Sequence, residues 1–374
     1  YPFLASIPTY AWKNSLSRID GRIYQWPIHR YLPGLSYFFK NSDTYDKVIG
    51  ADHQPKDVDD LKRILKELNQ PSKGQWAWGG IARYPFNFGV VGVSAIFGAP
   101  FRWALDNSGK LTAERETEAF KSAVSFVADL WKAGMVWPDA VSANNQRTNF
   151  VAGKFAMCIE GFGNSWNDFW RQGLEQAPPR HFDIIKPFRA HAGDKPISFI
   201  TGGYVSTNVM KKASPDRIKE QLRIVDYLAS PFGSQEDLLL SYGLSGTDYH
   251  LDSRANPKPT KAGNTDAGYV PWRYMSQHPY VEYQADLTGY AKRLFEVEKL
   301  LVDEGVSDAT DGFYSRTRYD AKGSAAEQSF WDGVNSVILG RKPFSSYDQL
   351  VKDWKTAAGD QIRKEYLEAM AAAK

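Results

Sequence analysis

Apolar residues at helical spacing mark the predicted helices of the chain. Between residues 57 and 68, every third or fourth position is apolar, at Leu61, Ile64, Leu65 and Leu68. This spacing places the four side chains on one helix face, the face that packs against a core. Similar spacing or helix-start signals predict further helices over 120–131, 214–228, 288–303, 326–339 and 346–372.

The helix predicted from Ser214 has a clear start. Ser214 is a preferred N-cap residue, and Pro215 suits the first helical position because its missing N–H would have no partner there. The inner face of this helix is predicted to hold Ile218, Leu222, Val225, Tyr227 and Leu228.

Alternating and continuous apolar runs predict strands over 22–28, 155–159 and 204–207. The run at 155–159 leads into a predicted loop, residues 160–166, that carries two glycines. The glycine- and aromatic-rich stretch 74–103 has no clear period, and the polar stretch 250–279 is predicted to be a connector. Strands that alternate with helices indicate the α/β class.

Composition narrows the functional classes. The 374 residues contain 46 Lys and Arg against 43 Asp and Glu, a net charge of +3, so nucleic acid is not expected as a partner. Trp, Tyr and Phe make up 14% of the chain, which leaves aromatic rings for ligands as well as for a core. No apolar run approaches the roughly 18 residues that indicate a membrane span.

Residue patterns typical of catalysis or metal binding are missing. The six histidines have no metal-ligand spacing, and the single cysteine, Cys158, can form neither an internal disulfide nor a cysteine-based zinc site. Glu160 is well placed for a glycosidase, but such an enzyme needs two facing carboxyl groups. We therefore expect no catalytic residue, no metal and no cofactor.

Several segments, in the order in which they occur, resemble the extracellular solute-binding proteins of sugar ABC transporters (family 1, maltose-binding-protein type). Residues 20–27 (Asp-Gly-Arg-Ile-Tyr-Gln-Trp-Pro), 150–157 (Phe-Val-Ala-Gly-Lys-Phe-Ala-Met) and 202–206 (Gly-Gly-Tyr-Val-Ser) carry this likeness. Further segments are similar to the lipoprotein-like branch common in Gram-positive bacteria: 242–246, 340–343, 351–354 and 359–366.

The start of the chain departs from this family pattern. In the family, several strands and helices of the first lobe precede the segment that resembles 20–27, whereas nineteen residues precede it here. We therefore expect the first lobe to be incomplete as given. The same departure would remove a lipobox cysteine and leaves the type of anchor open.

The resemblance implies a two-lobed fold like that of type II periplasmic binding proteins, with hinge strands and an interlobe cleft. It puts residues 1–27 and 204–270 in an N-terminal-type lobe and 28–203 with 271–374 in a C-terminal-type lobe. The chain would bind a carbohydrate, an oligosaccharide by this likeness, and deliver it by hinge closure to the membrane subunits of an ABC transporter. Such a protein is extracellular, either anchored by lipid to the cell envelope or periplasmic, and is expected to be a monomer.

The positions that match the family supply the candidate ligand-binding residues: Glu160, Asn164, Trp166, Tyr204, Trp76, Trp78, Arg83, Trp272, Tyr274, Phe313 and Tyr314. For Trp166, two interpretations stay open, a stacking platform for a sugar or a core residue. Rings at helical spacing are expected in the core, namely Trp131, Trp331 and Trp354.

Two functions of other classes also stay open at this point. The chain could be a glycan-active enzyme that uses Glu160, which carboxylates about 5–10 Å apart in a cleft would favour. It could also bind a non-sugar ligand such as a peptide or an organic cation, which an aromatic box without flanking amides would favour.

Overall fold

The computed structural model describes most of the chain. The residues outside the description are Ser17, Asp20, Gly21, Leu35, Ser36, Pro85, 268–270, Glu282, 284–287 and Lys374. Two positions of the sequence resemblance, Asp20 and Gly21, and the expected lobe boundary at 270 therefore lie outside the described residues. None of the helices in the described part is both long and apolar enough to cross a membrane.

The chain forms two compact units, each made of segments that are far apart in the sequence. Unit 1 consists of Tyr1–Leu32 and Thr201–Val297, and unit 2 of Pro33–Ile200 and Glu298–Lys374. Residues 28–32, 201–203 and 271–297 thus belong to unit 1, whereas the sequence analysis put them in the C-terminal-type lobe.

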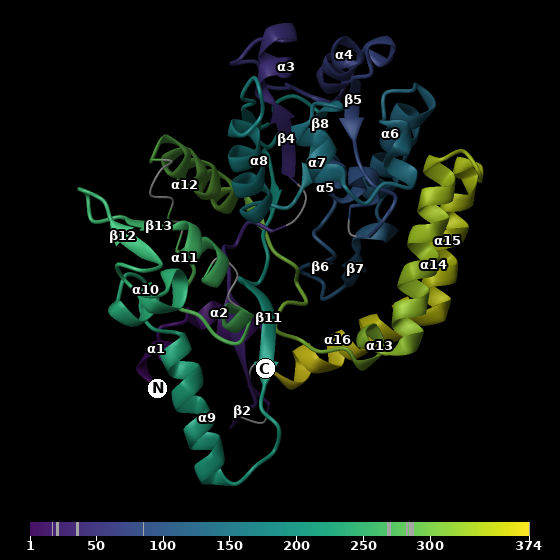
Figure 1. The fold of residues 1–374 in the computed structure, drawn as a ribbon. Helices are drawn as coiled ribbons and strands as arrows, with labels where there is room; N and C mark the ends of the chain where they lie inside the picture. The colour runs from purple at the N-terminus through teal and green to yellow at the C-terminus, as the bar shows by residue number, and fades with distance from the viewer. Residues whose placement is uncertain are drawn as a thin grey trace. The chain divides into compact units, whose positions relative to one another are not determined.

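A four-stranded mixed sheet forms the centre of unit 2, in the order β5-β8-β4-β9 (Figure 1). β5 (Trp76–Gly79) runs parallel to β8 (Phe155–Glu160), while β4 (Tyr37–Asn41) pairs antiparallel with β8 and with β9 (Phe182–Ile184). All residues of β8 are buried, as its apolar sequence predicts. Two smaller sheets are the antiparallel hairpin of β6 (Trp103–Leu105) with β7 (Leu111–Ala113) and the parallel pair of β10 (Ser198–Phe199) with β14 (Gly305–Val306).

Helices make up most of the rest of unit 2. The α-helices before β10 are α3 (Ser42–Val48), α4 (Val58–Leu68), α5 (Val90–Phe97), α6 (Glu118–Lys132), α7 (Gln146–Val151) and α8 (Asn164–Leu174). Those near the C-terminus are α13 (Arg316–Tyr319), α14 (Ala321–Ile338), α15 (Tyr347–Trp354) and α16 (Asp360–Ala372). Short 3-10 turns are η1 (Pro71–Lys73), η2 (Asn87–Gly89), η3 (Glu114–Glu116), η4 (Pro138–Val141) and η6 (Phe344–Ser346).

The start of α4 confirms the helix predicted over 57–68. The side chain of Asp57 accepts a hydrogen bond from the amide of Asp60 at 2.8 Å and so caps the helix. Leu61, Ile64 and Leu65 are buried together with Leu68. The apolar stripe read from the sequence is thus the face that α4 turns to the core.

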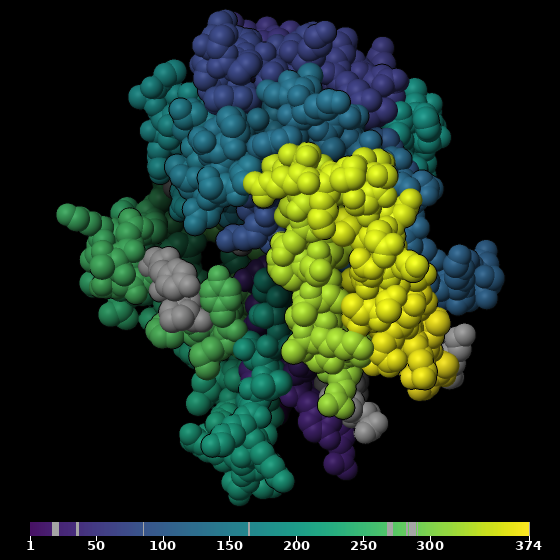
Figure 2. All heavy atoms as spheres, turned by 90° about the vertical axis from the view of Figure 1, so that its right-hand side faces the viewer, coloured from purple at the N-terminus to yellow at the C-terminus, as the bar shows by residue number. Residues whose placement is uncertain are grey.

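The C-terminal helices pack on earlier parts of the same unit. α14 contacts both α6 and α15, and Figure 2 shows the yellow C-terminal helices directly beside the blue segment of unit 2. α15 and α16 are joined by η7 (Lys355–Gly359), a turn of π-helix. A Cβ added at Gly359 would lie 2.6 Å from the indole of Trp354, so the absence of a side chain there lets this ring pack across the turn.

A close approach in the sheet of unit 2 gives the first testable prediction. A Cβ at Gly79 would lie 2.0 Å from the ring of Phe155, which is fixed by stacking on Phe150. Gly79→Ala is therefore expected to overpack the core and to lower the free energy of unfolding by about 1–3 kcal/mol. Urea unfolding measures this loss. Gly289→Ala is the control, since a Cβ there meets no atom within 4 Å, and equal losses in both variants would contradict the prediction.

The described part of unit 1 contains three two-stranded antiparallel sheets. The strand pairs are β1 (Arg18–Ile19) with β2 (Arg22–Ile23), β3 (Gln25–His29) with β11 (Tyr204–Val209), and β12 (Tyr249–Leu251) with β13 (Pro257–Pro259). Its helices are α1 (Pro2–Ala5), α2 (Thr9–Asn14), α9 (Pro215–Leu228), α10 (Gln235–Tyr242), α11 (Lys261–Asp266), the 3-10 turn η5 (Pro271–Tyr274) and α12 (Thr288–Asp303), which continues into unit 2. The stretch 250–279, predicted as a connector, therefore contains short strands and helices.

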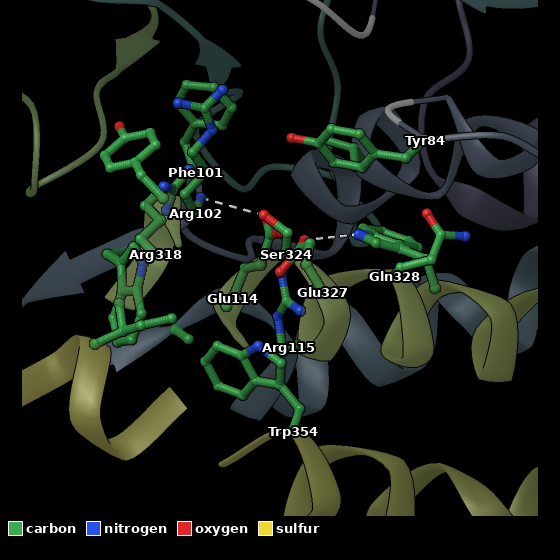
Figure 3. Close-up of a pocket in the computed structure, with 17 residues that line it drawn as sticks. Tyr84, Phe101, Arg102, Glu114, Arg115, Arg318, Ser324, Glu327, Gln328 and Trp354 are labelled. Carbon is green, nitrogen blue, oxygen red and sulfur yellow. Dashed lines mark hydrogen bonds and ion pairs between the residues drawn. The ribbon is translucent and has the colours of Figure 1, made fainter. Parts of the chain in front are cut away.

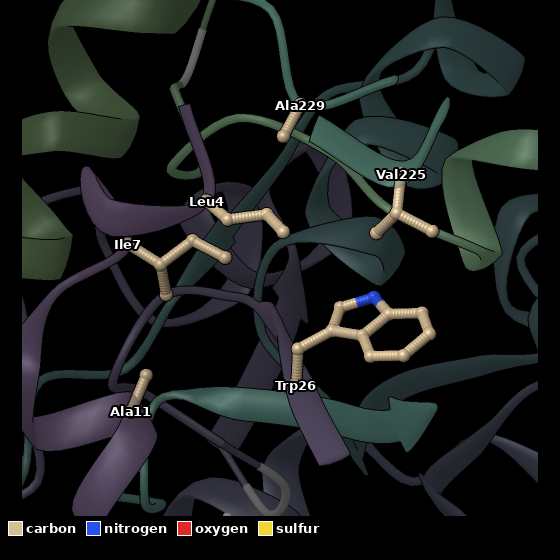
Figure 4. Packing of buried hydrophobic residues seen from close by; sticks show 6 residues of the cluster. All are labelled: Leu4, Ile7, Ala11, Trp26, Val225 and Ala229. Carbon is tan, nitrogen blue, oxygen red and sulfur yellow. The ribbon is translucent and has the colours of Figure 1, made fainter. Parts of the chain in front are cut away.

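A small apolar cluster holds α1, α2, β3 and α9 together. Figure 4 shows its members, Leu4, Ile7, Ala11, Trp26, Val225 and Ala229. A carboxylate on α9 also caps α1, because Asp226 accepts hydrogen bonds from the amides of Phe3 and Leu4 at 3.0 and 2.9 Å. Residues more than 200 positions apart are thereby joined in one core.

The inner face predicted for α9 is correct only in part. Ser214 caps the helix and Val225 is buried, as predicted. Tyr227, however, is exposed, and Leu222 is only partly buried against the cluster. The buried position beside Val225 is taken by Asp226, because its carboxylate is needed to cap α1.

Candidate functional site

A pocket of about 280 Å³ lies within unit 2, between α14, α13 and the β6–β7 hairpin (Figure 3). This volume is slightly below the range for small-molecule sites, about 300–1,000 Å³. Aromatic side chains form much of its wall: Tyr84, Phe101, Trp103, Tyr319, Trp331 and Trp354. Charged and hydrogen-bonding side chains complete it: Arg102, Glu114, Arg115, Arg318, Ser324, Glu327 and Gln328.

A buried ion pair forms one side of the pocket. Arg115 donates to Glu327 at 2.9 Å, and its guanidinium lies 4.3 Å from the ring centre of Phe330 and 4.4 Å from that of Trp354. The indole Nε1 of Trp331 donates to the same oxygen of Glu327 at 2.8 Å. Burial acts to raise the pKa of Glu327, but the charge of Arg115 and these hydrogen bonds outweigh it and lower the pKa.

Glu114 is a second carboxyl group at the pocket, in different surroundings. Its Oε2 accepts a hydrogen bond from the amide of Arg102 at 3.2 Å. Burial raises the pKa of Glu114 to about 7, although the charge of Arg115 opposes this shift. A carboxyl group with so raised a pKa in a lined pocket is a feature typical of functional sites.

Exposed tyrosines lie at the pocket rim. Tyr319 leaves 63% of its surface exposed and stacks on Tyr314, with ring centres 5.7 Å apart and an angle of 9° between the planes. Tyr84 is also exposed and lies 6.0 Å from the ring of Trp331. Figure 3 shows the hydroxyl end of Tyr84 directed across the pocket toward Arg102. The pocket thus offers flat apolar surfaces together with polar groups in fixed positions.

Two of the candidate residues from the sequence, both tryptophans, are buried elsewhere in unit 2. Trp78, on β5, is fully buried and donates from Nε1 to the carbonyl of Phe88 at 2.9 Å. Trp166 leaves 1% of its surface exposed, and its ring packs on Phe39 and Phe162. The loop predicted over 160–166 is shorter than expected, because α8 already begins at Asn164 and contains Trp166. The backbone of Asn164 belongs to α8, but its side chain is outside the described part.

Glu160 is also buried, at the end of β8. Its Oε2 lies 3.2 Å from Nε of Arg147, and its Oε1 accepts from the amide of Gly161 at 2.9 Å. Arg147 also reaches Asp168, at 3.3 Å. Both carboxylates are thus engaged by one guanidinium, an arrangement typical of a structural ion-pair network.

The remaining candidates lie at or near the surface. In unit 2, Trp76 is half-buried, and Arg83 is exposed next to Tyr84. Phe313 is partly buried and precedes Tyr314, which stacks on the pocket residue Tyr319. In unit 1, the exposed residues Trp272 and Tyr274 lie on η5, which contacts β11 through a hydrogen bond from Asn208 to the carbonyl of Tyr274. Tyr204, half-buried, is on β11 as well. Among the candidates whose side chains are described, Tyr314 contacts a residue of the pocket wall, and Arg83 adjoins another one in the sequence.

Sequence reasoning missed most of the pocket. Trp331 and Trp354 are buried, as predicted, but they also line the pocket, and helical spacing does not distinguish these two situations. Arg102 has a positive φ of 56°, which its sequence does not reveal. One usable signal was the segment 313–319, where aromatic and arginine side chains gather. No group of three or more potential metal ligands is found among the described residues.

Comparison with known proteins identifies relatives of the chain. No family model matches it. It is 23% identical over 282 residues to lipoprotein LipO and 24% identical over 335 residues to the polygalacturonan/rhamnogalacturonan-binding protein YtcQ, both of Bacillus subtilis. The matches cover 72% and 86% of this chain but 54% of LipO and 65% of YtcQ, so the chain spans little more than half to about two thirds of these relatives.

Solved structures establish the fold. The N-glycan transport solute-binding protein NgtS of Streptococcus pneumoniae superposes with a TM-score of 0.65 at 14% identity, over 100% of this chain and 80% of NgtS. The maltose-bound protein MalE3 of T. maritima superposes with a TM-score of 0.58 at 16% identity, over 95% and 78%. By their names, YtcQ is a binding protein and NgtS is a solute-binding protein. The chain is thus a homologue of LipO and YtcQ with the mixed α/β fold of maltose-binding-protein-type solute-binding proteins, which confirms the resemblance seen in its sequence.

Proposed function

We propose that this chain binds a carbohydrate and that the pocket of unit 2 receives one of its sugar rings. The observation that carries the proposal is the pairing of aromatic rings with planar polar side chains around one volume of about 280 Å³. A pyranose has apolar C–H faces that stack on rings such as those of Tyr319 and Trp331. Its hydroxyl groups need donors and acceptors, which Arg, Glu and Gln side chains supply in fixed directions.

The relatives support the same class of ligand. YtcQ is a polygalacturonan/rhamnogalacturonan-binding protein, and NgtS is an N-glycan transport protein. We propose that the chain is likewise a solute-binding component of an ABC transporter. Because its relative LipO is a lipoprotein, we also propose that the chain is extracellular and associated with the cell envelope. That two lobes close on the ligand and present it to the transporter's membrane subunits is part of this proposal.

The two alternatives from the sequence have less support. An organic cation is disfavoured, because Arg102 and Arg318 line the pocket without a close carboxylate partner and would repel it. For an enzyme that uses Glu160, the carboxylate would have to leave Arg147 and the amide of Gly161. We therefore propose binding without covalent chemistry.

Removing an exposed ring at the pocket tests the proposal. Tyr319→Ala is expected to weaken binding of the best saccharide by about five- to a hundred-fold, the loss of one stacking platform worth about 1–3 kcal/mol. Because this ring is mostly exposed, the melting temperature should change little. Thermal shift over a panel of saccharides identifies the ligand, and calorimetry then measures its affinity for each variant.

A control is Tyr227→Ala, which removes another exposed ring, from α9 of unit 1. This variant should bind like the unaltered chain. The proposal is wrong if no saccharide in the panel binds, or if Tyr319→Ala and Tyr227→Ala have the same affinity as the unaltered chain.

A further inference from the structure

The three guanidinium groups of the pocket differ in how they are neutralised. Arg115 is paired with Glu327 at 2.9 Å. Arg102 has Asp308 at 3.8 Å, a long contact, and Asp308 is itself engaged by the amide and hydroxyl of Thr310 at 2.9 and 2.7 Å. Arg318 has no carboxylate within ion-pair distance among the described residues.

Arg318 is the cation of this pocket that is left for a ligand. Within the part of the chain that the structure describes, its guanidinium donates no hydrogen bond and lies 5.8 Å from the ring centre of Tyr319. The carboxylates of Asp308 and Glu327 act on it electrostatically, but from beyond ion-pair distance. A guanidinium remains charged at any physiological pH and offers up to five donors in one plane. Such a group at a pocket is suited to a bidentate contact with a carboxylate.

The helix that carries Arg318 is held firmly in place. Ser315, at the N-cap of α13, donates from its hydroxyl to Glu365 of α16 at 2.7 Å. Thr317 donates to the same carboxylate from its amide and its hydroxyl, at 2.9 and 2.7 Å. α13 has four residues and is held by these three hydrogen bonds, so the backbone of Arg318 has little freedom to move. A fixed backbone favours a directional contact of the guanidinium with a ligand.

We propose that the carbohydrate bound here is acidic, a uronic acid residue whose carboxylate is bound by Arg318 while its ring lies against Tyr319. This inference rests on the proposed function and narrows the class of its ligand. The carboxylate would give Arg318 a hydrogen-bonded negative partner, whereas Asp308 and Glu327 act on it only from a longer distance. A neutral sugar would displace water from this guanidinium without supplying a charged hydrogen-bond partner, which is less favourable.

The test compares ligands that differ only in charge. An oligogalacturonide of two or three residues and its methyl ester have the same ring and nearly the same size, but the ester lacks the carboxylates. Isothermal calorimetry at low salt is expected to give at least tenfold tighter binding of the acid, with glucuronate and mannuronate oligomers measured alongside because the inference concerns the class. A hydrogen bond to a charged group contributes about 1.5–3 kcal/mol, which corresponds to a roughly ten- to a hundred-fold difference in affinity.

The variants assign the effect to one residue. Arg318→Gln should lower affinity for the best acid by about ten- to a hundred-fold and change affinity for its ester less than about twofold. Arg316→Gln, an exposed arginine on the same helix, should leave both affinities unchanged. Equal binding of acid and ester, or equal loss of both in Arg318→Gln, would overturn the inference while the proposed function stands. If neither charged nor neutral saccharides bind, the proposed function itself fails, and this inference with it.

Discussion

Trp166→Ala is expected to lower the free energy of unfolding by about 3–5 kcal/mol. The indole is 1% exposed and packs between Phe39 of β4 and Phe162, with ring centres 6.1 and 5.9 Å away. Its removal would leave a cavity next to the central sheet, which the surrounding rings cannot fill without moving the strand. Urea unfolding followed by circular dichroism measures the loss.

Two further variants make this result decisive. Trp272→Ala removes an indole that is 45% exposed in unit 1 and should change the unfolding free energy by less than about 0.5 kcal/mol. Trp166→Phe keeps part of the packing and should be stable enough for binding measurements if the alanine variant does not fold. A small loss of stability together with a large loss of saccharide affinity would instead assign Trp166 to the ligand site.

Lowering the pH from 7.5 to 4 is expected to destabilise the chain by about 3 kcal/mol through His29 alone. Burial lowers the pKa of His29 from its usual 6.5 to about 4, and the charges of Arg30 and His278 add to this. The unfolded chain therefore takes up the proton first as the pH falls. The stabilisation is complete above about pH 6.5 and is lost between pH 6.5 and 4.

Hydrogen bonds explain why His29 stays neutral. Its Nδ1 accepts from the amide of Tyr280 at 2.7 Å, so in the neutral ring the proton is on Nε2, which is 2.7 Å from the hydroxyl of Tyr10. Protonation of Nδ1 would put two donors face to face. His29→Gln should flatten the pH profile of unfolding between 6.5 and 4, whereas His250→Gln, at an exposed histidine, should keep it. An unchanged profile in His29→Gln would show that other groups cause the acid sensitivity.

Local signals in the sequence were sufficient for many elements of the fold. The start of α4 depends on one side chain, Asp57, and that of α9 on Ser214, so both could be read from neighbouring residues. β8 could be predicted because a run of apolar residues buried on both faces is distinctive. The start of α8 was misplaced, since Gly163 and Asn164 in sequence are as typical of a loop as of a helix end.

The pocket could not be derived from the sequence in the same way. Tyr84, Arg102, Arg318 and Trp331 come from segments more than 200 positions apart, and only the packing of α13 and α14 against the β6–β7 hairpin and its neighbours brings them together. For Trp166, the sequence could not distinguish a ligand contact from a core position. Its place after a strand and two glycines suited a ligand contact, but the position of α8 against β4 decides where the ring points.

The π-helical turn between α15 and α16 gives a single inserted position unusual importance. A turn of this kind contains about one residue more than an α-helical turn, which rotates everything after it by about 100° around the axis. With the helix after the turn rotated in this way, Glu365 accepts hydrogen bonds from Ser315 and Thr317. Trp354, which precedes the turn, lines the pocket. When relatives are aligned, a gap of one residue in this helix therefore predicts a changed position of Glu365 and Trp354 relative to each other, and not only a different surface length.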